Sequence, residues 1–246
     1  MPPESVPNSD NEQPPDPLVE AMEEHKGNLY WALKSIARRV ETNASGEITL
    51  LFVKYTASVG NDGFKLIGQL NKLESLDATD ASITNAGTAP LANLQLLREL
   101  ILDITELGDE GLPPISKLRS LKRLSVSATR VGDLGLKVIA KLRNLESLNL
   151  SATNITHVGL EYLKPLSNLT HLDLGENGIR DDGIIHLSAF QKLQSLTLNY
   201  NRLTDHSADW LKGFKQLKFL NLNGNLISDK KRAELIESMP GTTINT

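Results

Sequence analysis

Residues 145–168, LESLNLSATNITHVGLEYLKPLSN, contain the pattern that decides the fold. The pattern recurs every 24 residues without a gap, in copies that start at Leu73, Leu97, Leu121, Leu145, Leu169, Leu193 and Leu217. Position 4 of each copy is leucine: Leu76, Leu100, Leu124, Leu148, Leu172, Leu196 and Leu220. Positions 6 and 11 are also apolar throughout. Columns this regular identify a repeat architecture.

Each copy combines two periodicities. Apolar positions 4 and 6 alternate with polar neighbours, as in a strand, whereas Leu160, Leu163 and Leu166 keep helical spacing. A copy is therefore predicted to form a short strand, a turn and a short helix. One such unit cannot bury its apolar side alone, so the copies must stack. The predicted fold is an α/β solenoid shaped like a horseshoe, with parallel strands on the concave face and short helices on the convex face.

Polar columns occupy the turns. Position 9 is Thr105, Thr129, Thr153, Asn177, Asn201 and Asn225. We expect these side chains to bond the backbone of adjacent turns. Position 13 is aspartate in five copies: Asp109, Asp133, Asp181, Asp205 and Asp229. An acid at a helix start caps free N–H groups and suits the helix dipole, so this column is predicted to be structural. Position 15 is often glycine, which indicates close packing.

The flanks of the array divide the chain further. Residues 1–17 hold six of the eleven prolines and are predicted to be a disordered acidic tail. Residues 18–47 are predicted to be an N-terminal capping helix, interrupted at Gly27 and Asn28, and a turn into the first strand. Residues 48–246 then form the repeat domain, with one degenerate and seven clear copies. The degenerate copy fits two registers, with either Leu51 or Phe52 in the core. The last copy has a charged helix and is predicted to be the C-terminal cap.

At these residues the chain resembles the leucine-rich-repeat superfamily, in the style LxxLxLxxTxITDxGLxxLxxLxx. It is similar to bacterial repeat proteins with a Thr-Asp turn and, more distantly, to the cysteine-containing repeats of F-box proteins. The resemblance covers residues 48–246 and is specific for the fold. For function, it implies a recognition scaffold that binds proteins, by analogy only.

Composition restricts the function further. The chain has no cysteine, which excludes disulfides and cysteine nucleophiles, and its net charge of -4 does not favour nucleic-acid binding. No stretch reaches the roughly 18 apolar residues of a membrane span. We expect a monomer that binds a protein of unknown identity, with no nucleic acid, no membrane insertion and no cofactor. The absence of a signal peptide favours a cytoplasmic protein. If the sequence has been trimmed to a mature form, an exported protein is expected instead.

No catalytic motif is present, and no two histidines have a metal-ligand spacing, so we predict a protein that is not an enzyme and holds no metal. His157, His186 and His206 are expected to be solvated. The concave face remains, formed by positions 3, 5, 7 and 8. Its C-terminal part carries the aromatic side chains, and the predicted partner-binding residues are His171, Asp173, Glu176, Asn199, Tyr200, Phe219 and Asn221.

Two other interpretations remain open at this point. Phe219 could instead cover the edge of the terminal repeat, and Tyr200 could pack over its own loop. The predicted function is a non-catalytic protein-binding scaffold that recognises its partner on the concave face. The alternative is a structural repeat protein of an envelope or surface layer, and a less favoured one is an enzyme regulator.

Overall fold

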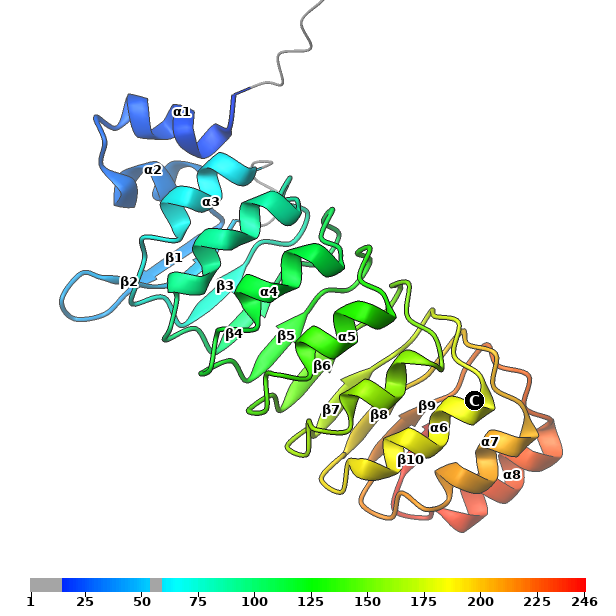
Figure 1. Ribbon diagram of the computed structural model, residues 1–246. Helices are drawn as coiled ribbons and strands as arrows, with labels where there is room; N and C mark the ends of the chain where they lie inside the picture. The colour runs from blue at the N-terminus through cyan, green and yellow to red at the C-terminus, as the bar shows by residue number, and fades with distance from the viewer. Residues whose placement is uncertain (1–14, 54–58) are drawn as a thin grey trace, which may run out of the picture.

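The computed structural model describes residues 15–53 and 59–246, which form an elongated stack of strand and helix layers (Figure 1). Ten strands of this part form one sheet in sequence order. They are β1 (Arg39–Thr42), β2 (Ile48–Phe52), β3 (Ser75–Asp77), β4 (Glu99–Ile101), β5 (Arg123–Ser125), β6 (Ser147–Asn149), β7 (His171–Asp173), β8 (Ser195–Thr197), β9 (Phe219–Asn221) and β10 (Thr243–Asn245). β1 is antiparallel to β2, and every later pair is parallel.

Helical segments cover one side of this sheet, as Figure 1 shows for α3 to α7. The α-helices are α1 (Pro17–Glu24), α2 (Leu29–Ile36), α3 (Asn61–Ile67), α4 (Leu112–Ile115), α5 (Asp133–Ile139), α6 (Asp181–Ile184), α7 (Asp205–Leu211) and α8 (Asp229–Ser238). The 3-10 helices are η1 (Asn85–Asn93), η2 (Asp109–Gly111), η3 (Gly159–Leu163) and η4 (Ile185–Ala189). The predicted α/β solenoid is confirmed, although several of its short helices are 3-10.

The leucine columns form the core between the two layers. Leu148 and Leu172, at position 4 of adjacent copies, are 1% and 2% exposed, and Leu160 on the helical side is fully buried. Buried side chains form one continuous cluster from Leu18 to Met239. Each repeat therefore buries its apolar side against its neighbours, as a solenoid requires.

The structure settles the register of the degenerate first copy. Leu51 is fully buried and pairs with Leu76, whereas Phe52 is half-buried and pairs with Asp77. Leu51 is therefore the position-4 residue. Because Val59 occupies the position-11 place in the core, the copy has one residue more than the others between Leu51 and Val59.

The N-terminal region differs in part from the prediction. Asn28 caps α2 as expected, since its side chain accepts a hydrogen bond from the Trp31 N–H at 3.2 Å. A turn does lead into β2 at the end of residues 18–47, but the prediction missed the strand before it, because Val40 lies in β1 and pairs with Leu51 in an antiparallel hairpin. A β-branched residue followed by a turn centred on Gly46 suits a hairpin better than a helix end. Residues 1–14 of the predicted tail lie outside the described residues.

The position-13 side chains are structural, but their predicted role as caps of their own helices is wrong. Four of the five aspartates accept a hydrogen bond from the position-12 N–H of the next repeat, as Asp133 does from Thr156 at 2.8 Å and Asp205 from Ser228 at 2.7 Å, while Asp229 lies in the last copy and has no next repeat. Asn85 makes the same bond to Gly108. The helix cap is usually the position-12 residue itself, so the position-13 side chain is free to reach the neighbouring turn. We call this column the position-13 ladder.

Asp16 extends the ladder beyond the first repeat. Its Oδ2 accepts from the N–H groups of Gly60 and Gly63 at 2.7 and 2.8 Å, and its Oδ1 accepts from Leu18 at 3.0 Å as the cap of α1. A Cβ added at Gly63 would lie 2.7 Å from Asp16, just as a Cβ at Gly135 would lie 2.4 Å from Asp109. Asp16 thus replaces the missing preceding repeat, and the predicted tail ends before this residue.

The position-9 column ties adjacent turns together through its asparagines. The Asn201 side chain donates to the carbonyls of Leu174 and Leu198, and its oxygen accepts from the Ile179 N–H at 3.0 Å. Thr129 instead donates only to the Val126 carbonyl of its own repeat. The predicted bonds between turns are therefore confirmed for asparagine, whose longer side chain reaches both repeats.

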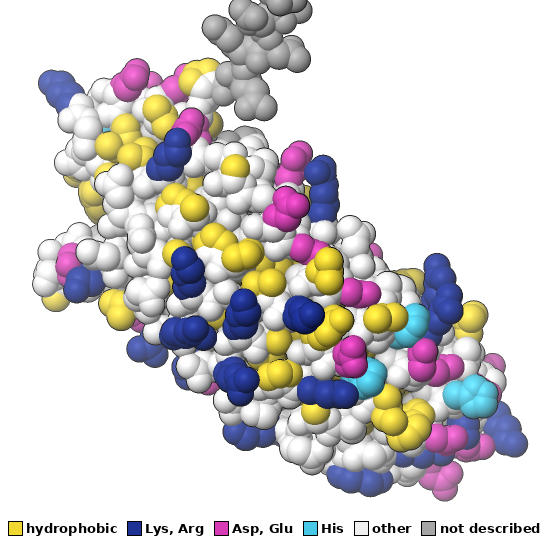
Figure 2. All heavy atoms as spheres, viewed as in Figure 1, with side chains coloured by type: hydrophobic (Ala, Val, Ile, Leu, Met, Phe, Trp, Pro, Cys, Tyr) yellow, Lys and Arg dark blue, Asp and Glu magenta, His cyan; other side chains and the backbone are white. Residues whose placement is uncertain are grey.

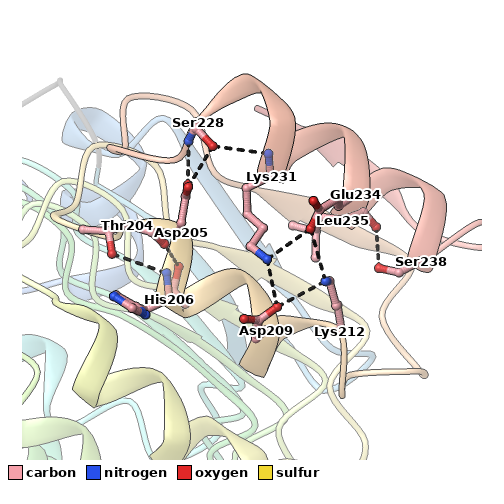
Figure 3. A network of polar contacts seen from close by, with 11 residues as sticks. Thr204, Asp205, His206, Asp209, Lys212, Ser228, Lys231, Glu234, Leu235 and Ser238 are labelled. Atoms are coloured by element: carbon pink, nitrogen blue, oxygen red, sulfur yellow. Dashed lines mark hydrogen bonds and ion pairs between the residues drawn. The ribbon is translucent and has the colours of Figure 1, made fainter.

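The C-terminal helix α8 is attached to α7 by polar contacts (Figure 3). The pKa of Asp205 lies below its ordinary value, first because of the hydrogen bond from the Ser228 N–H and then because of the Ser228 hydroxyl. Lys231 lies 3.2 Å from Asp209 and 3.1 Å from Glu234. Beyond α8, β10 adds a strand to β9 that the sequence pattern did not predict. The cap is therefore a charged helix followed by a final strand.

Candidate functional site

The strand register creates lateral rows of side chains on the concave face. His171 pairs with Ser195, and Ser195 with Phe219, so these residues form the predicted row at position 3. Asp173, Thr197 and Asn221 form the parallel row at position 5. Neighbouring strands in a sheet lie about 4.8 Å apart, so adjacent members of each row are in reach of one partner.

A hollow of about 290 Å³ lies on this face over β4 to β8. Of the predicted site residues, it is lined by His171 and Asp173. Its other polar lining comes from Arg123, Ser125, Ser147, Asn149, Ser195 and Thr197. The structure thus brings two predicted residues to the hollow and places Phe219 and Asn221 farther along the same rows, toward the C-terminal end.

The selection of site residues from the sequence missed Arg123, Ser147 and Asn149 as hollow-lining residues. The available signal was side-chain size, because Ser147 is small while Arg123 and His171 on either side of it are long. Small side chains between long ones leave space above the sheet. Arg123 is held to one side of the hollow by Glu99, with 3.4 Å between Arg123 Nε and Glu99 Oε1.

Asp173 has the unusual electrostatics of the site. Burial raises the pKa of its carboxyl, the hydrogen bond from the Gly175 N–H lowers it, and the nearby charge of Glu176 raises it again, so the net shift is upward. Only Oδ1 accepts a hydrogen bond from the described residues, at 2.9 Å from the Gly175 nitrogen. No cation of the described part of the chain lowers the pKa of this carboxyl, so the ionised carboxylate is partly desolvated without a compensating charge there.

The same column shows that the charge at Asp173 is not required for the turn. Asn149 Oδ1 accepts from the Ser151 N–H at 3.0 Å, and Asn221 Oδ1 accepts from the Asn223 N–H at 3.1 Å. A neutral amide therefore fulfils the backbone role of this position in the neighbouring repeats. Asn221, a predicted site residue, has this structural role as well.

Three predicted residues lie in the turns that follow the strands. Glu176 and Tyr200 occupy position 8 with positive φ values of 54° and 50°, in a column where every described copy has left-handed backbone. Tyr200 is 63% exposed, yet its ring packs on Gly224 of the next turn, where an added Cβ would lie 2.3 Å from Cδ1. Asn199 lies over Gly175 beside Asp173. The Tyr200 ring therefore packs against Gly224 on one side and is exposed to solvent on the other, and it forms the rim of the concave surface.

Phe219 does not cover the terminal edge of the sheet, because Thr243 of β10 pairs with it on that side. Its ring is half-buried within the row. His171 is exposed, and its Nδ1 lies 2.9 Å from the Thr170 hydroxyl. These two side chains are thus available at opposite ends of one row, with Ser195 between them.

The other predictions about histidines and metals have mixed outcomes. His206 is exposed, whereas His157 is half-buried, and its Nδ1 is the one buried side-chain nitrogen or oxygen without a hydrogen-bond partner in residues 15–53 and 59–246. The prediction of solvation is wrong for His157 because it stands at position 13, inside the ladder. Within the same residues, no group of His, Asp and Glu side chains could hold a metal ion, and no helix is long and apolar enough to cross a membrane.

Comparisons with known proteins support the repeat assignment. A family model described as leucine rich repeat matches residues 119–179 and 183–229. The structure is similar to internalin C2 from Listeria monocytogenes, with a TM-score of 0.65 and 29% identity over 80% of this chain and 81% of that one. A leucine-rich-repeat protein of Leptospira interrogans matches with a TM-score of 0.49 and 21% identity, over 74% of this chain and 57% of that one.

No curated protein sequence matches the chain. Proteins of the matched family are generally binding scaffolds, and the family model and internalin C2 indicate no catalytic family. The 24-residue columns, the stacked parallel strands and the family model agree that the chain is built of leucine-rich repeats, with the family model matching residues 119–179 and 183–229.

Proposed function

We propose that this chain is a non-catalytic scaffold whose concave face binds a protein partner. The surface extends from the hollow at His171 and Asp173 to Phe219, Asn221 and the rim formed by Tyr200, with Glu176 and Asn199 beside it. Aromatic rings among polar groups, such as the exposed Tyr200 and the half-buried Phe219, contribute most to binding where a partner can exclude water from them. Leucine-rich-repeat proteins typically act as interaction scaffolds, which supports this function in general terms.

The single observation that carries the proposal is the desolvated carboxylate of Asp173. Its raised pKa means that the folded protein tolerates an unfavourable charge at neutral pH. Asparagine would provide the same backbone hydrogen bond without that charge, as Asn149 and Asn221 do in the same column. Groups that are unfavourable for stability are often retained for function. We infer that Asp173 accepts hydrogen bonds from a donor group of the partner.

Site-specific crosslinking in the native cell tests the location of this surface. A photoreactive amino acid at Ser195, between His171 and Phe219, should capture one protein. The same group at Ser188, exposed on η4, is the matched control and should capture much less of that protein. Affinity of the captured protein for purified chain should then fall when Asp173 is changed to asparagine.

Two results would contradict the proposal. Capture of the same protein from Ser188 but not from Ser195 would place the interface on the helical side. Capture of only envelope polymer from both positions would support a structural role instead.

A further inference from the structure

Charge is divided between the two long edges of the solenoid. Figure 2 shows Lys and Arg side chains gathered along one side of the helical layer, and Asp and Glu side chains along the other. In each repeat the turn from strand to helix lies at one edge of the solenoid, and the loop from the helix to the next strand lies at the other. The chain has a net charge of -4, so its basic edge is a local departure from its average.

Two hollows lie along this basic edge. One of about 620 Å³ is lined by five cations, Arg119, Lys137, Lys141, Arg143 and Lys164, and by a single carboxylate, Glu161. The other, of about 600 Å³, has Arg98, Lys122 and Lys192 in its lining. Arg119 and Asn144 line both hollows, so the two form one groove. We call it the basic groove.

Among the described residues, six of the eight cations of the basic groove have no carboxylate within 4.0 Å, although some of them bond neutral groups, as Lys192 does the Asn168 side chain. Lys122 lies 2.7 Å from Glu146, and Arg98 lies 3.6 Å from Glu74. For the five cations of the larger hollow, the described residues provide no carboxylate within 4.0 Å. Like charges held close together repel one another, and an anionic ligand bound among them relieves this repulsion.

The backbone beneath these cations is ordered by side-chain hydrogen bonds between repeats. Asn144 donates to the Arg119 carbonyl at 2.8 Å, and Asn168 donates to the Arg143 carbonyl at 3.1 Å. Arg119 itself donates to the Lys141 carbonyl at 3.3 Å. The groove therefore presents its charges from a fixed framework, which reduces the ordering cost of binding.

The lining also contains an apolar component. Leu142 and Pro165 contribute to the larger hollow, and the Tyr162 ring lies there with Lys137 Nζ at 5.4 Å from its centre. A surface of mixed cations and apolar groups in a hollow fits a peptide with acidic and apolar side chains.

We propose that the basic groove binds an extended acidic segment of a protein. The lining of the two hollows spans the strands from β3, which follows Glu74, to β8, which follows Lys192. Five strand spacings of about 4.8 Å give a length of about 24 Å, which an extended segment of about seven residues covers. The acidic opposite edge and the half-buried single ring disfavour nucleic acid, which would require a wider positive field and exposed stacking faces.

The test uses the full chain and a fluorescein-labelled peptide of about ten residues, glutamates with two central tyrosines, which exceeds the length of the groove. Fluorescence anisotropy should show saturable binding that weakens as salt is raised, because screening shortens the range of the attraction. The double variant Arg119→Glu with Arg143→Glu should weaken this binding at least about tenfold.

A second double variant provides the matched control. Arg180→Glu with Arg202→Glu makes the same change in net charge at two exposed arginines outside the groove. It should bind the peptide within about twofold of the parent chain, since these arginines lie in the turns between strand and helix and do not line the groove. Melting curves of both variants should match the parent, because all four side chains are exposed.

Three outcomes would overturn this proposal. An equal loss of affinity in both double variants would show attraction to net charge alone. Absence of peptide binding by the parent chain would exclude an acidic peptide as the occupant. Binding to a short DNA duplex or to phosphatidylserine vesicles that is tighter than binding to the peptide would assign the groove to another class of ligand.

Discussion

Replacement of His157 by asparagine should stabilise the protein, because it repairs the one interrupted step of the position-13 ladder. In the steps on either side, Asp133 accepts from the Thr156 N–H at 2.8 Å and Asp181 from the Thr204 N–H at 2.8 Å. At His157 the imidazole does not bond Arg180, whose N–H has no acceptor in the described residues, and His157 Nδ1 is buried without a partner.

The gain can be estimated from the groups involved. Asn61 and Asn85 occupy the same position and accept the corresponding N–H at 3.0 and 2.7 Å, so an amide oxygen has the correct reach. A net hydrogen bond contributes about 0.5–1.5 kcal/mol, and removal of an unpartnered buried nitrogen acts in the same direction. Loss of the 3.5 Å contact of His157 with the exposed Asp182 costs little. The expected gain is about 1 kcal/mol, or about 2–4 °C in melting temperature.

Thermal and urea unfolding of purified chain measure this gain. His206→Asn is the matched control. His206 is exposed, lies two repeats farther along the chain and does not belong to the ladder. The control should melt within the error of the parent. If His157→Asn melts at or below the parent temperature, the ladder does not stabilise the fold in the way described.

Three further predictions concern the core, the N-terminal cap and the site. Leu148→Ala and Leu172→Ala should each destabilise the chain by about 2–5 kcal/mol in urea unfolding, as truncations of buried leucine do; a cost below about 1 kcal/mol would contradict their burial. Asp16→Ala should lower stability by about 1–3 kcal/mol, because two N–H groups of the first repeat lose their acceptor, whereas Asp16→Asn should lower it less. Asp173→Asn should raise the melting temperature at pH 7. The folded pKa of Asp173 is raised, so its ionised form costs stability at neutral pH, and this cost disappears as pH falls through that pKa. The difference between parent and variant should therefore shrink in acid, and a variant that melts lower at pH 7 would contradict the electrostatic account.

The repeat columns allowed the core and strand register to be predicted because they follow from apolar periodicity alone. Leu148 and Leu172 face the core, and the row His171, Ser195 and Phe219 exists as expected. Where the pattern weakens, the prediction failed. β10 (Thr243–Asn245) has only one aliphatic residue, and β1 pairs in an antiparallel hairpin that no repeat column contains.

Contacts between repeats were harder to predict from the sequence. A column of aspartates is compatible both with capping the helix in the same repeat and with bonding the next turn, and only the geometry distinguishes the two. Asp16 could not be recognised as a ladder residue because it lies 44 residues before its partner Gly60. The hollow near His171 depends on the relative sizes of side chains in three adjacent strands, which a single column does not show.

The most direct test of the central claim is calorimetric titration of the captured partner into the parent chain and into the variants Tyr200→Ala and Phe219→Ala. Trp210→Ala is the matched control, because this ring is 51% exposed on α7, away from the concave rows. The account predicts that Tyr200→Ala and Phe219→Ala each weaken binding by about 1–3 kcal/mol while the control binds like the parent, with little change in melting temperature for any of them. Parental affinity in both concave variants would show that the concave face near β8 and β9 does not bind the partner.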